Sequence, residues 1–160
     1  MACELAREVV RTFGQVRLRV SGTSMAPSIL PGDLISVQRA RWGEIAPGEI
    51  VMFSQRERLF VHRVVARRVV SSVDGPEEPC LITRGDRLGH EDPPVFPSQL
   101  LGRVVSIQRG QRNVTFSSQP RGSHHPILRL LQTSDRATYF YLRIAAGWRT
   151  LFLRRAKCPA

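Results

Sequence analysis

Lysine is almost missing from this chain. Its 160 residues include a single lysine, Lys157, and every other cationic side chain that is permanently charged is an arginine. Arginine stays protonated in proteins and cannot accept a proton near neutral pH. Lysine chemistry is therefore excluded from nearly the whole chain, and a side-chain base must be a histidine, a carboxylate or the remote Lys157.

Long apolar runs and paired cysteines are also missing. No segment approaches the roughly 18 apolar residues of a membrane-spanning helix, and residues 1–13 carry scattered charges that a signal peptide would not have. The three cysteines, Cys3, Cys80 and Cys158, are an odd number without metal-type spacing. We expect free thiols in a reducing compartment and neither a metal nor a cofactor. These absences predict a cytoplasmic or peripheral membrane protein.

The formal net charge is +11. Clustered cations would indicate nucleic-acid binding, but here the arginines are spread along the whole chain. This even distribution argues against a nucleic-acid partner. The positive net charge itself favours an anionic membrane surface as the partner.

Alternating and β-branched segments dominate the chain between about residues 15 and 118. Apolar and polar residues alternate strictly in "QVRLRV", and "RLFVHRVVARRVV" contains no strand breaker. Turn sequences separate further strands, and "RGQR" is expected to close a hairpin. Leu5, Val9 and Phe13 repeat at helical spacing over residues 2–13. We therefore predict a mainly β fold with a short N-terminal helix.

The C-terminal quarter has a different character. We expect a β domain over residues 1–119, followed by a linker and a basic amphipathic helical tail over residues 120–160. Two interpretations of this tail stay open. It lies on an anionic membrane with Trp148 and Phe152 at the interface, or it packs as helices on the β domain.

The stretch "SGTSMAPSILPGDL" contains the first candidate for chemistry. Ser24 follows Gly22, which allows unusual backbone angles, and precedes the rigid Pro27. A serine nucleophile needs an adjacent base and a stabilised oxyanion, and the main-chain N–H of Ser24 could contribute to an oxyanion hole. The alternative is an ordinary turn serine, because serine, glycine and proline are common in turns.

His62 is the candidate base. It lies in the middle of the expected strand "FVHRVV", on the same face as Phe60 and Val64. The alternative is a core histidine with a structural partner. The polar loop "RGDRLGHEDPP", however, places Asp86 and Asp92 after the next strand, where either could orient an imidazole.

Taken in order, "SMAPSILPGD", "VHRVV" and "RGD" resemble type I signal peptidases, over about residues 16–107. The likeness is closest to the archaeal and endoplasmic-reticulum branch, which uses histidine where most bacterial members and the related repressor autoproteases use lysine. The resemblance implies an antiparallel β fold with Ser24 as nucleophile and His62 as general base. It aligns Asp86 with the family's Gly-Asp motif and Asp92 with a second acidic residue, and leaves open which one touches the imidazole.

The resemblance extends to further residues of the expected site. It assigns Gly22, Thr23 and Met25 to oxyanion or substrate binding, with Met25 lining a pocket for a small side chain. Asp33 also matches a family position, where we expect a turn residue, and Arg63 is expected to form a structural salt bridge. The sequence departs from the family in two ways. We expect a short amphipathic helix and one strand before Ser24, where the family usually has a transmembrane helix, and we expect no cap domain, because no large second insertion is present.

The function expected from these residues is that of a serine endopeptidase of the signal peptidase type, which cleaves a peptide or precursor after a small residue. A histidine base predicts activity that rises with pH through about 6.5. One alternative is a self-cleaving regulator, although the Ala146–Gly147 bond lies after Ser24 and such regulators use lysine. The other is a non-catalytic peptide-binding module with the same fold.

Overall fold

A computed structural model describes residues 2–71 and 77–114 of the chain. The expected boundary at residue 119 and the C-terminal tail lie outside these residues. The elements, in chain order, are helix α1 (Ala2–Phe13), strands β1 (Gln15–Arg19) and β2 (Leu34–Gln38), the 3-10 turn η1 (Trp42–Glu44), strands β3 (Ile50–Gln55), β4 (Arg58–Ser71) and β5 (Glu77–Arg84), the 3-10 turn η2 (Pro97–Gln99), and strands β6 (Leu100–Arg109) and β7 (Arg112–Val114). The prediction of a mainly β fold with one short N-terminal helix is confirmed.

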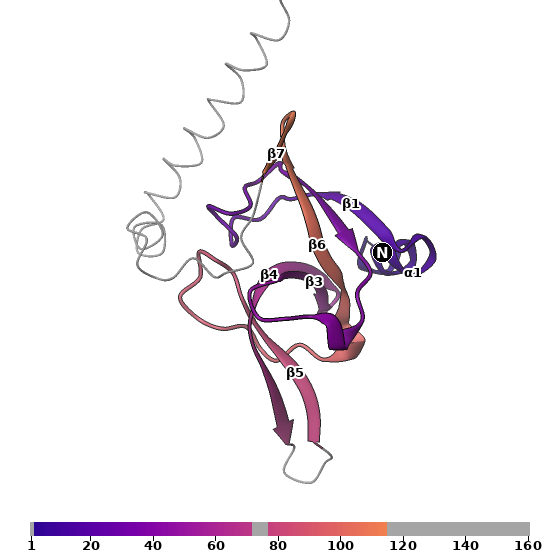
Figure 1. The fold of residues 1–160 in the computed structure, drawn as a ribbon, viewed down its shortest axis with the longest axis vertical. Coiled ribbons are helices and arrows are strands. Elements are labelled where there is room, and N and C mark those ends of the chain that lie inside the picture. The colour runs from indigo at the N-terminus through magenta and orange to yellow at the C-terminus, as the bar shows by residue number, and fades with distance from the viewer. Residues whose placement is uncertain (1, 72–76, 115–160) are drawn as a thin grey trace, which may run out of the picture. The chain divides into compact units, whose positions relative to one another are not determined.

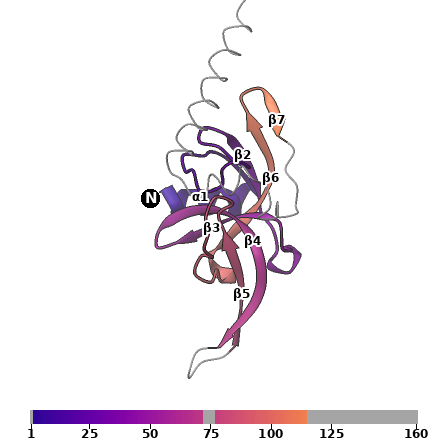
Figure 2. The same ribbon diagram turned by 90° about the vertical axis from the view of Figure 1, so that its left-hand side faces the viewer.

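The strands form one antiparallel sheet in the order β1-β2-β6-β3-β4-β5, with β7 paired to β6. Strand β6 lies in the middle of this order and joins the β1–β2 hairpin to the three strands β3–β5. The backbones of β2 and β6 approach closely at Gly102, where a Cβ atom would lie 2.3 Å from the carbonyl oxygen of Gln38. The outer parts of β4 and β5 continue as a two-stranded ribbon beyond the other strands (Figures 1 and 2).

Helix α1 packs beside β1 and also contacts β6, an inner strand of the sheet (Figure 1). Its buried residues are Ala6 and Val10, whereas Leu5 and Phe13 are exposed. The repeat of large apolar residues therefore predicted the helix but does not mark the face that packs. The guanidinium of Arg7 donates to the hydroxyl of Ser54 on β3 (2.6 Å). This hydrogen bond helps to keep the face of α1 that contains Ala6 and Val10 turned towards the sheet.

Strand β4 carries His62 and is set in register by a tight hairpin. Gln55 pairs with Arg58, and the two residues between them, Arg56 and Glu57, both have positive φ angles, as the two-residue turns of twisted hairpins require. The same register places His62 opposite Val51 of β3. The imidazole is thus attached to an inner strand with hydrogen-bonded neighbours on both sides.

Apolar side chains gather in two core clusters. The larger cluster includes Val10, Met25 and Ile35, and the smaller one includes Phe53 and Leu81. Burial of these side chains supplies the main driving force for folding.

The expectations for the cysteines and for membrane-spanning helices can be compared with the described part of the chain. Cys3 and Cys80 are free thiols there, as predicted. Among residues 2–71 and 77–114, no helix has the length and apolar character needed to cross a membrane.

Candidate active site

Ser24 and His62 are in hydrogen-bond contact. Ser24 lies on the loop between β1 and β2, residues 20–33, which we call the serine loop. His62 lies on β4, and its Nε2 atom is 2.9 Å from the Oγ atom of Ser24. This is the distance at which a histidine can take a proton from a hydroxyl.

The other ring nitrogen of His62 contacts Asp92. The Nδ1 atom is 2.6 Å from Oδ2 of Asp92, which lies on the loop after β5; we call residues 85–94 the acidic loop. A carboxylate can only accept a hydrogen bond, so in the neutral imidazole Nδ1 carries the proton and Nε2 presents its lone pair to Ser24. The order serine, imidazole and carboxylate is that of a catalytic triad.

The imidazole is enclosed by aromatic rings. His62 is only 4 % exposed, and its ring lies 6.1 Å from the ring of Phe53 and 5.9 Å from that of Phe60, centroid to centroid. Apolar surroundings disfavour an unpaired charge, and they strengthen hydrogen bonds to a charged group that is paired. The ring is therefore held in one orientation, with both nitrogens engaged.

Asp86 takes a different place from Asp92. Its two carboxylate oxygens accept from Nε and Nη2 of Arg63, both at 2.8 Å, and Oδ2 also accepts from the hydroxyl of Ser28. A further nitrogen of Arg63 donates to the carbonyl of Gly48. The expected salt bridge of Arg63 is confirmed, and Asp86 joins the acidic loop to β4 and to the serine loop.

The acidic loop and the serine loop also meet through their main chains. The N–H of Arg87 donates to the carbonyl oxygen of Ser24 at 2.9 Å. Gly85 makes this approach sterically feasible, since a Cβ atom there would lie 2.7 Å from the same oxygen. The Gly-Asp pair of the acidic loop thus has two roles. Gly85 allows the close approach to Ser24, and the Asp86 carboxylate binds Arg63 and Ser28.

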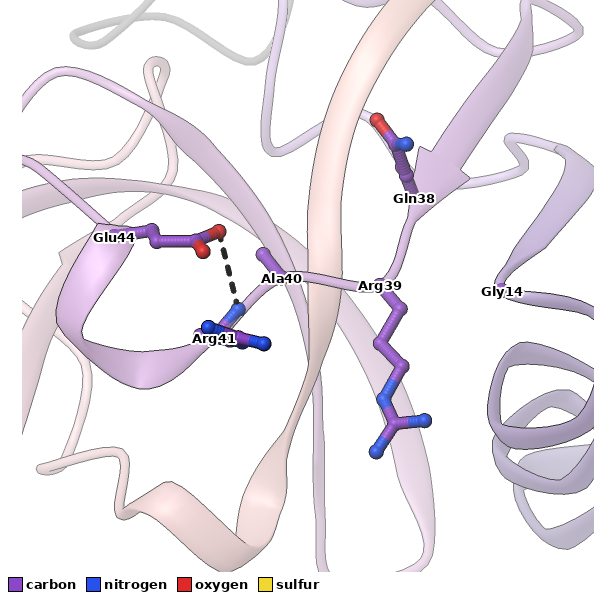
Figure 3. Close-up of a pocket in the computed structure, with 6 residues that line it drawn as sticks. All are labelled: Gly14, Gln38, Arg39, Ala40, Arg41 and Glu44. Carbon is purple, nitrogen blue, oxygen red and sulfur yellow. Dashed lines mark hydrogen bonds between the residues drawn. The ribbon is translucent and has the colours of Figure 1, made fainter.

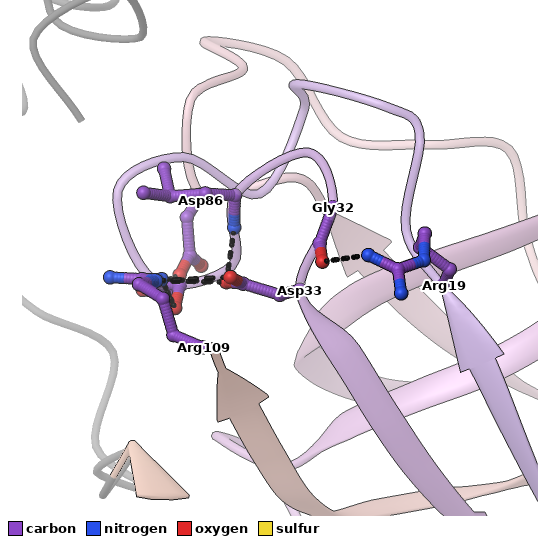
Figure 4. A network of polar contacts seen from close by, with 7 residues as sticks. Arg19, Gly32, Asp33, Asp86 and Arg109 are labelled. Atoms are coloured by element: carbon purple, nitrogen blue, oxygen red, sulfur yellow. Dashed lines mark hydrogen bonds and ion pairs between the residues drawn. The ribbon is translucent and has the colours of Figure 1, made fainter. Parts of the chain in front are cut away.

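A second ion pair braces the far end of the serine loop (Figure 4). Asp33 is completely buried and accepts from the main-chain N–H of Leu30 and from the guanidinium of Arg109 on β6, with 2.7 Å between Nη2 and Oδ2. Arg109 also donates to the carbonyl of Ser28. Asp33 therefore fixes the return of the serine loop into β2.

The remaining predicted site residues lie beside Ser24 in sequence. Gly22 is exposed, with open space where a Cβ atom would stand, and Thr23 is half-buried. Met25 was expected to line a substrate pocket, but its side chain is 2 % exposed and packs in the larger core cluster. In this structure Met25 anchors the serine loop to the core.

Sequence reasoning did not identify Thr83 or Arg109. Thr83 is fully buried on β5 and donates its hydroxyl hydrogen to Oδ2 of Asp92 at 2.7 Å. A threonine inside an apolar strand, three residues before the Gly-Asp pair, is the signal that could have drawn attention to it. Arg109 gives no comparable signal, because it is one of many arginines.

A separate pocket opens near the other end of β2 (Figure 3). The residues that line it are Gly14, Gln38, Arg39, Ala40, Arg41 and Glu44. It contains none of the predicted site residues, so it is distinct from the contact between Ser24 and His62.

Comparison with known proteins gives a family match over part of the chain. Residues 2–71 match the family model described as Peptidase S24-like, and the matched segment contains both Ser24 and His62. Comparison with the curated proteins gave no match. The matched part of the chain is thus similar to S24-like peptidases, which supports a serine peptidase or a self-cleaving regulator.

Proposed function

We propose that this protein is a serine endopeptidase of the signal peptidase type, with Ser24 as nucleophile and His62 as general base. The observation that carries the proposal is the 2.9 Å contact between Ser24 Oγ and His62 Nε2, on a ring whose other nitrogen faces Asp92. A serine hydroxyl needs such a base to attack a peptide bond. No lysine precedes Lys157 to take this role.

The reaction begins with transfer of the Ser24 hydroxyl proton to Nε2 of His62, as the oxygen attacks the carbonyl carbon of the scissile bond. Asp92 stabilises the imidazolium that forms, through the proton on Nδ1. The imidazolium then protonates the leaving amine, the carbon–nitrogen bond breaks, and an acyl-enzyme remains on Ser24. A water molecule that gives its proton to His62 hydrolyses this ester and restores the hydroxyl.

The serine loop offers a donor for the oxyanion. Among the described residues, no main-chain carbonyl accepts from the N–H of Ser24, while the carbonyl of Thr23, in the same peptide group, accepts from the N–H of Ala26 at 3.1 Å. An N–H group fixed in this way needs no reorganisation when negative charge develops on the substrate oxygen. Gly22 and Thr23, beside it, are proposed to contact the substrate main chain. The proposed preference for a small residue before the cleaved bond comes from the resemblance to signal peptidases.

The substrate is proposed to bind in an extended form. Strand β1 is an edge strand of the sheet and leads directly into the serine loop. An unpaired strand edge can add a peptide as a further strand. A peptide paired along this edge would be directed towards Ser24.

The proposed domain division leaves residues 120–160 as a basic tail. We propose an anionic membrane surface as its partner, because arginines are interspersed with large apolar residues there. Co-sedimentation with anionic vesicles tests this partner. An unchanged bound fraction after deletion of residues 126–160 would remove it from the proposal.

A fluorophosphonate probe, which labels activated serines, tests the proposed function. The intact protein should be labelled, and Ser24→Ala and His62→Ala should not be. Ser106→Ala is the matched control, since Ser106 is exposed on β6 and should leave labelling unchanged. Equal labelling of all four proteins, or none of the intact protein, would contradict a catalytic Ser24 and favour a non-catalytic peptide-binding module.

Two further measurements refine the result. Cleavage of an added peptide distinguishes an endopeptidase from a self-cleaving regulator, which would shorten its own chain and leave the peptide intact. A histidine base should give activity that rises with pH well below the range in which a lysine loses its proton. A rise confined to the range of a lysine would contradict the assignment of His62.

A further inference from the structure

Thr83 contacts the same carboxylate oxygen as the imidazole does. Its hydroxyl is 2.7 Å from Oδ2 of Asp92, and Nδ1 of His62 is 2.6 Å from that oxygen. A carboxylate is an acceptor only, so both groups donate to it. Oδ2 therefore lies between two donors from neighbouring strands, Thr83 on β5 and His62 on β4.

The main chain of Thr83 makes a separate contact with the same aspartate. Its carbonyl oxygen accepts from the N–H of Asp92 at 2.8 Å and closes the acidic loop onto the end of β5. Thr83 is 0 % exposed and pairs with Val64, two residues after His62. The backbone contact fixes where the aspartate lies, which leaves the hydroxyl to act on the carboxylate alone.

We propose that Thr83 is a positioning residue of the active site, which orients the Asp92 carboxylate and limits how strongly it holds the proton of His62. This inference rests on the proposed function. A hydrogen bond donated to a carboxylate spreads and stabilises its negative charge. Without the hydroxyl, Oδ2 is a stronger acceptor towards Nδ1, and the imidazolium becomes more stable relative to the neutral ring.

The groups around His62 leave Asp92 as its main electrostatic partner. On β4 the neighbouring charge, Arg63, is held by Asp86 of the acidic loop. The ring faces Phe53 of β3 and Phe60 of β4, which do not titrate. Among the described residues, Asp92 is the one ionisable group that hydrogen-bonds to the imidazole.

The test compares Thr83→Val, which removes the hydroxyl at nearly constant shape, with Thr83→Ser, which keeps it. The rate of fluorophosphonate labelling is measured for each from about pH 5 to 9, where a histidine base titrates. Thr83→Val should move the midpoint of the acidic limb upwards by about half a pH unit and lower the maximal rate by about tenfold. Thr83→Ser should keep the midpoint of the intact protein, with a rate within about twofold of it.

The outcomes separate this inference from the proposed function. Absence of labelling in the intact protein would end the proposed function itself. Normal labelling of the intact protein, together with a Thr83→Val profile of unchanged rate and midpoint, would overturn only the role of Thr83. A fall in rate for Thr83→Val without a shift of the midpoint would also overturn it, because that is the result of a packing defect. If Thr83→Val fails to fold by circular dichroism, Thr83→Ser decides, and loss of its activity would contradict a role for the hydroxyl.

Discussion

The main-chain N–H of Arg87 donates a hydrogen bond to the carbonyl oxygen of Ser24. This contact joins two loops that are more than sixty residues apart in the chain. One loop carries the proposed nucleophile and the other carries both aspartates of the site. The distance between Ser24 and His62 is therefore set by backbone contacts as well as by the two side chains.

The two aspartates of the acidic loop should respond differently to removal of their charge. Asp92→Asn should lower peptidase activity by about 10³- to 10⁴-fold, because the imidazole loses the group that fixes its tautomer. Asp86→Asn should instead lower the free energy of unfolding by about 3 kcal/mol, because the buried Arg63 loses a carboxylate that neutralises its charge. Activity assays and denaturant titrations distinguish the two effects. If Asp92→Asn lowered the free energy of unfolding and Asp86→Asn did not, the assignment of Asp86 to stability and of Asp92 to activity would be wrong.

Gly85→Ala should reduce activity by about 10- to 100-fold, the cost of misplacing a reacting group by around 1 Å. The added methyl would lie 2.7 Å from the Ser24 carbonyl, so one of the two loops must shift. Gly89→Ala is the matched control in the same loop, with nothing within 4 Å of its Cβ position. Labelling rates check the prediction. Equal rates for both variants would show that the close approach does not position Ser24.

Arg109→Gln should destabilise the protein by about 2 kcal/mol, because Asp33 is completely buried and loses its charged donor. The matched control is Arg103→Gln on the same strand. Arg103 pairs with Glu49 at 3.4 Å, both side chains are partly exposed, and its loss should cost less than about 0.5 kcal/mol. Thermal or denaturant unfolding measures both. A larger effect at Arg103 would contradict the bracing role of Asp33.

Glu8 and Arg11 form an exposed pair on α1 whose effect on stability should be small and dependent on pH. The hydrogen bond and the charge of Arg11 lower the pKa of Glu8 from its ordinary 4.5, and Glu8 in turn raises the pKa of Arg11. A carboxyl whose pKa is lowered by folding stabilises the fold above its unfolded value, and this contribution is lost as the pH falls through the folded value.

Glu8→Gln should therefore shift the unfolding temperature by less than about 2 °C at neutral pH. The difference from the intact protein should vanish in acid, where both carry an uncharged side chain at this position. Calorimetry at the two pH values checks this. A difference that grows in acid would mean that Glu8 acts through another contact.

The strands could be predicted from the sequence because their pattern is local. Alternation in "QVRLRV" matches the exposure of β1, in which Val16 and Leu18 are half-buried and the flanking polar residues are exposed. The position of β6 between β2 and β3 could not be predicted, because strand order depends on pairing between distant segments. The burial of Ala6 and Val10 in α1 could not be predicted for the same reason, because it depends on contacts between the helix and distant strands of the sheet.

The candidate site was predictable in type but not in detail. Ser24 and His62 were named from their motifs, and the structure places them in contact. Asp86 and Asp92 could not be told apart, because both follow β5 within one loop. Their partners distinguish them: Arg63 engages Asp86, whereas Thr83 and His62 engage Asp92.

The central place of β6 has a consequence for synthesis of the chain. The β1–β2 hairpin pairs with no strand of the β3–β5 group and is linked to it through β6. A ribosome that has reached residue 99 has already polymerised Ser24, His62 and Asp92, yet the strand that unites the two halves of the sheet has not been made. The proposed hydrolytic competence should thus appear only after β6 has been synthesised and has paired with both β2 and β3.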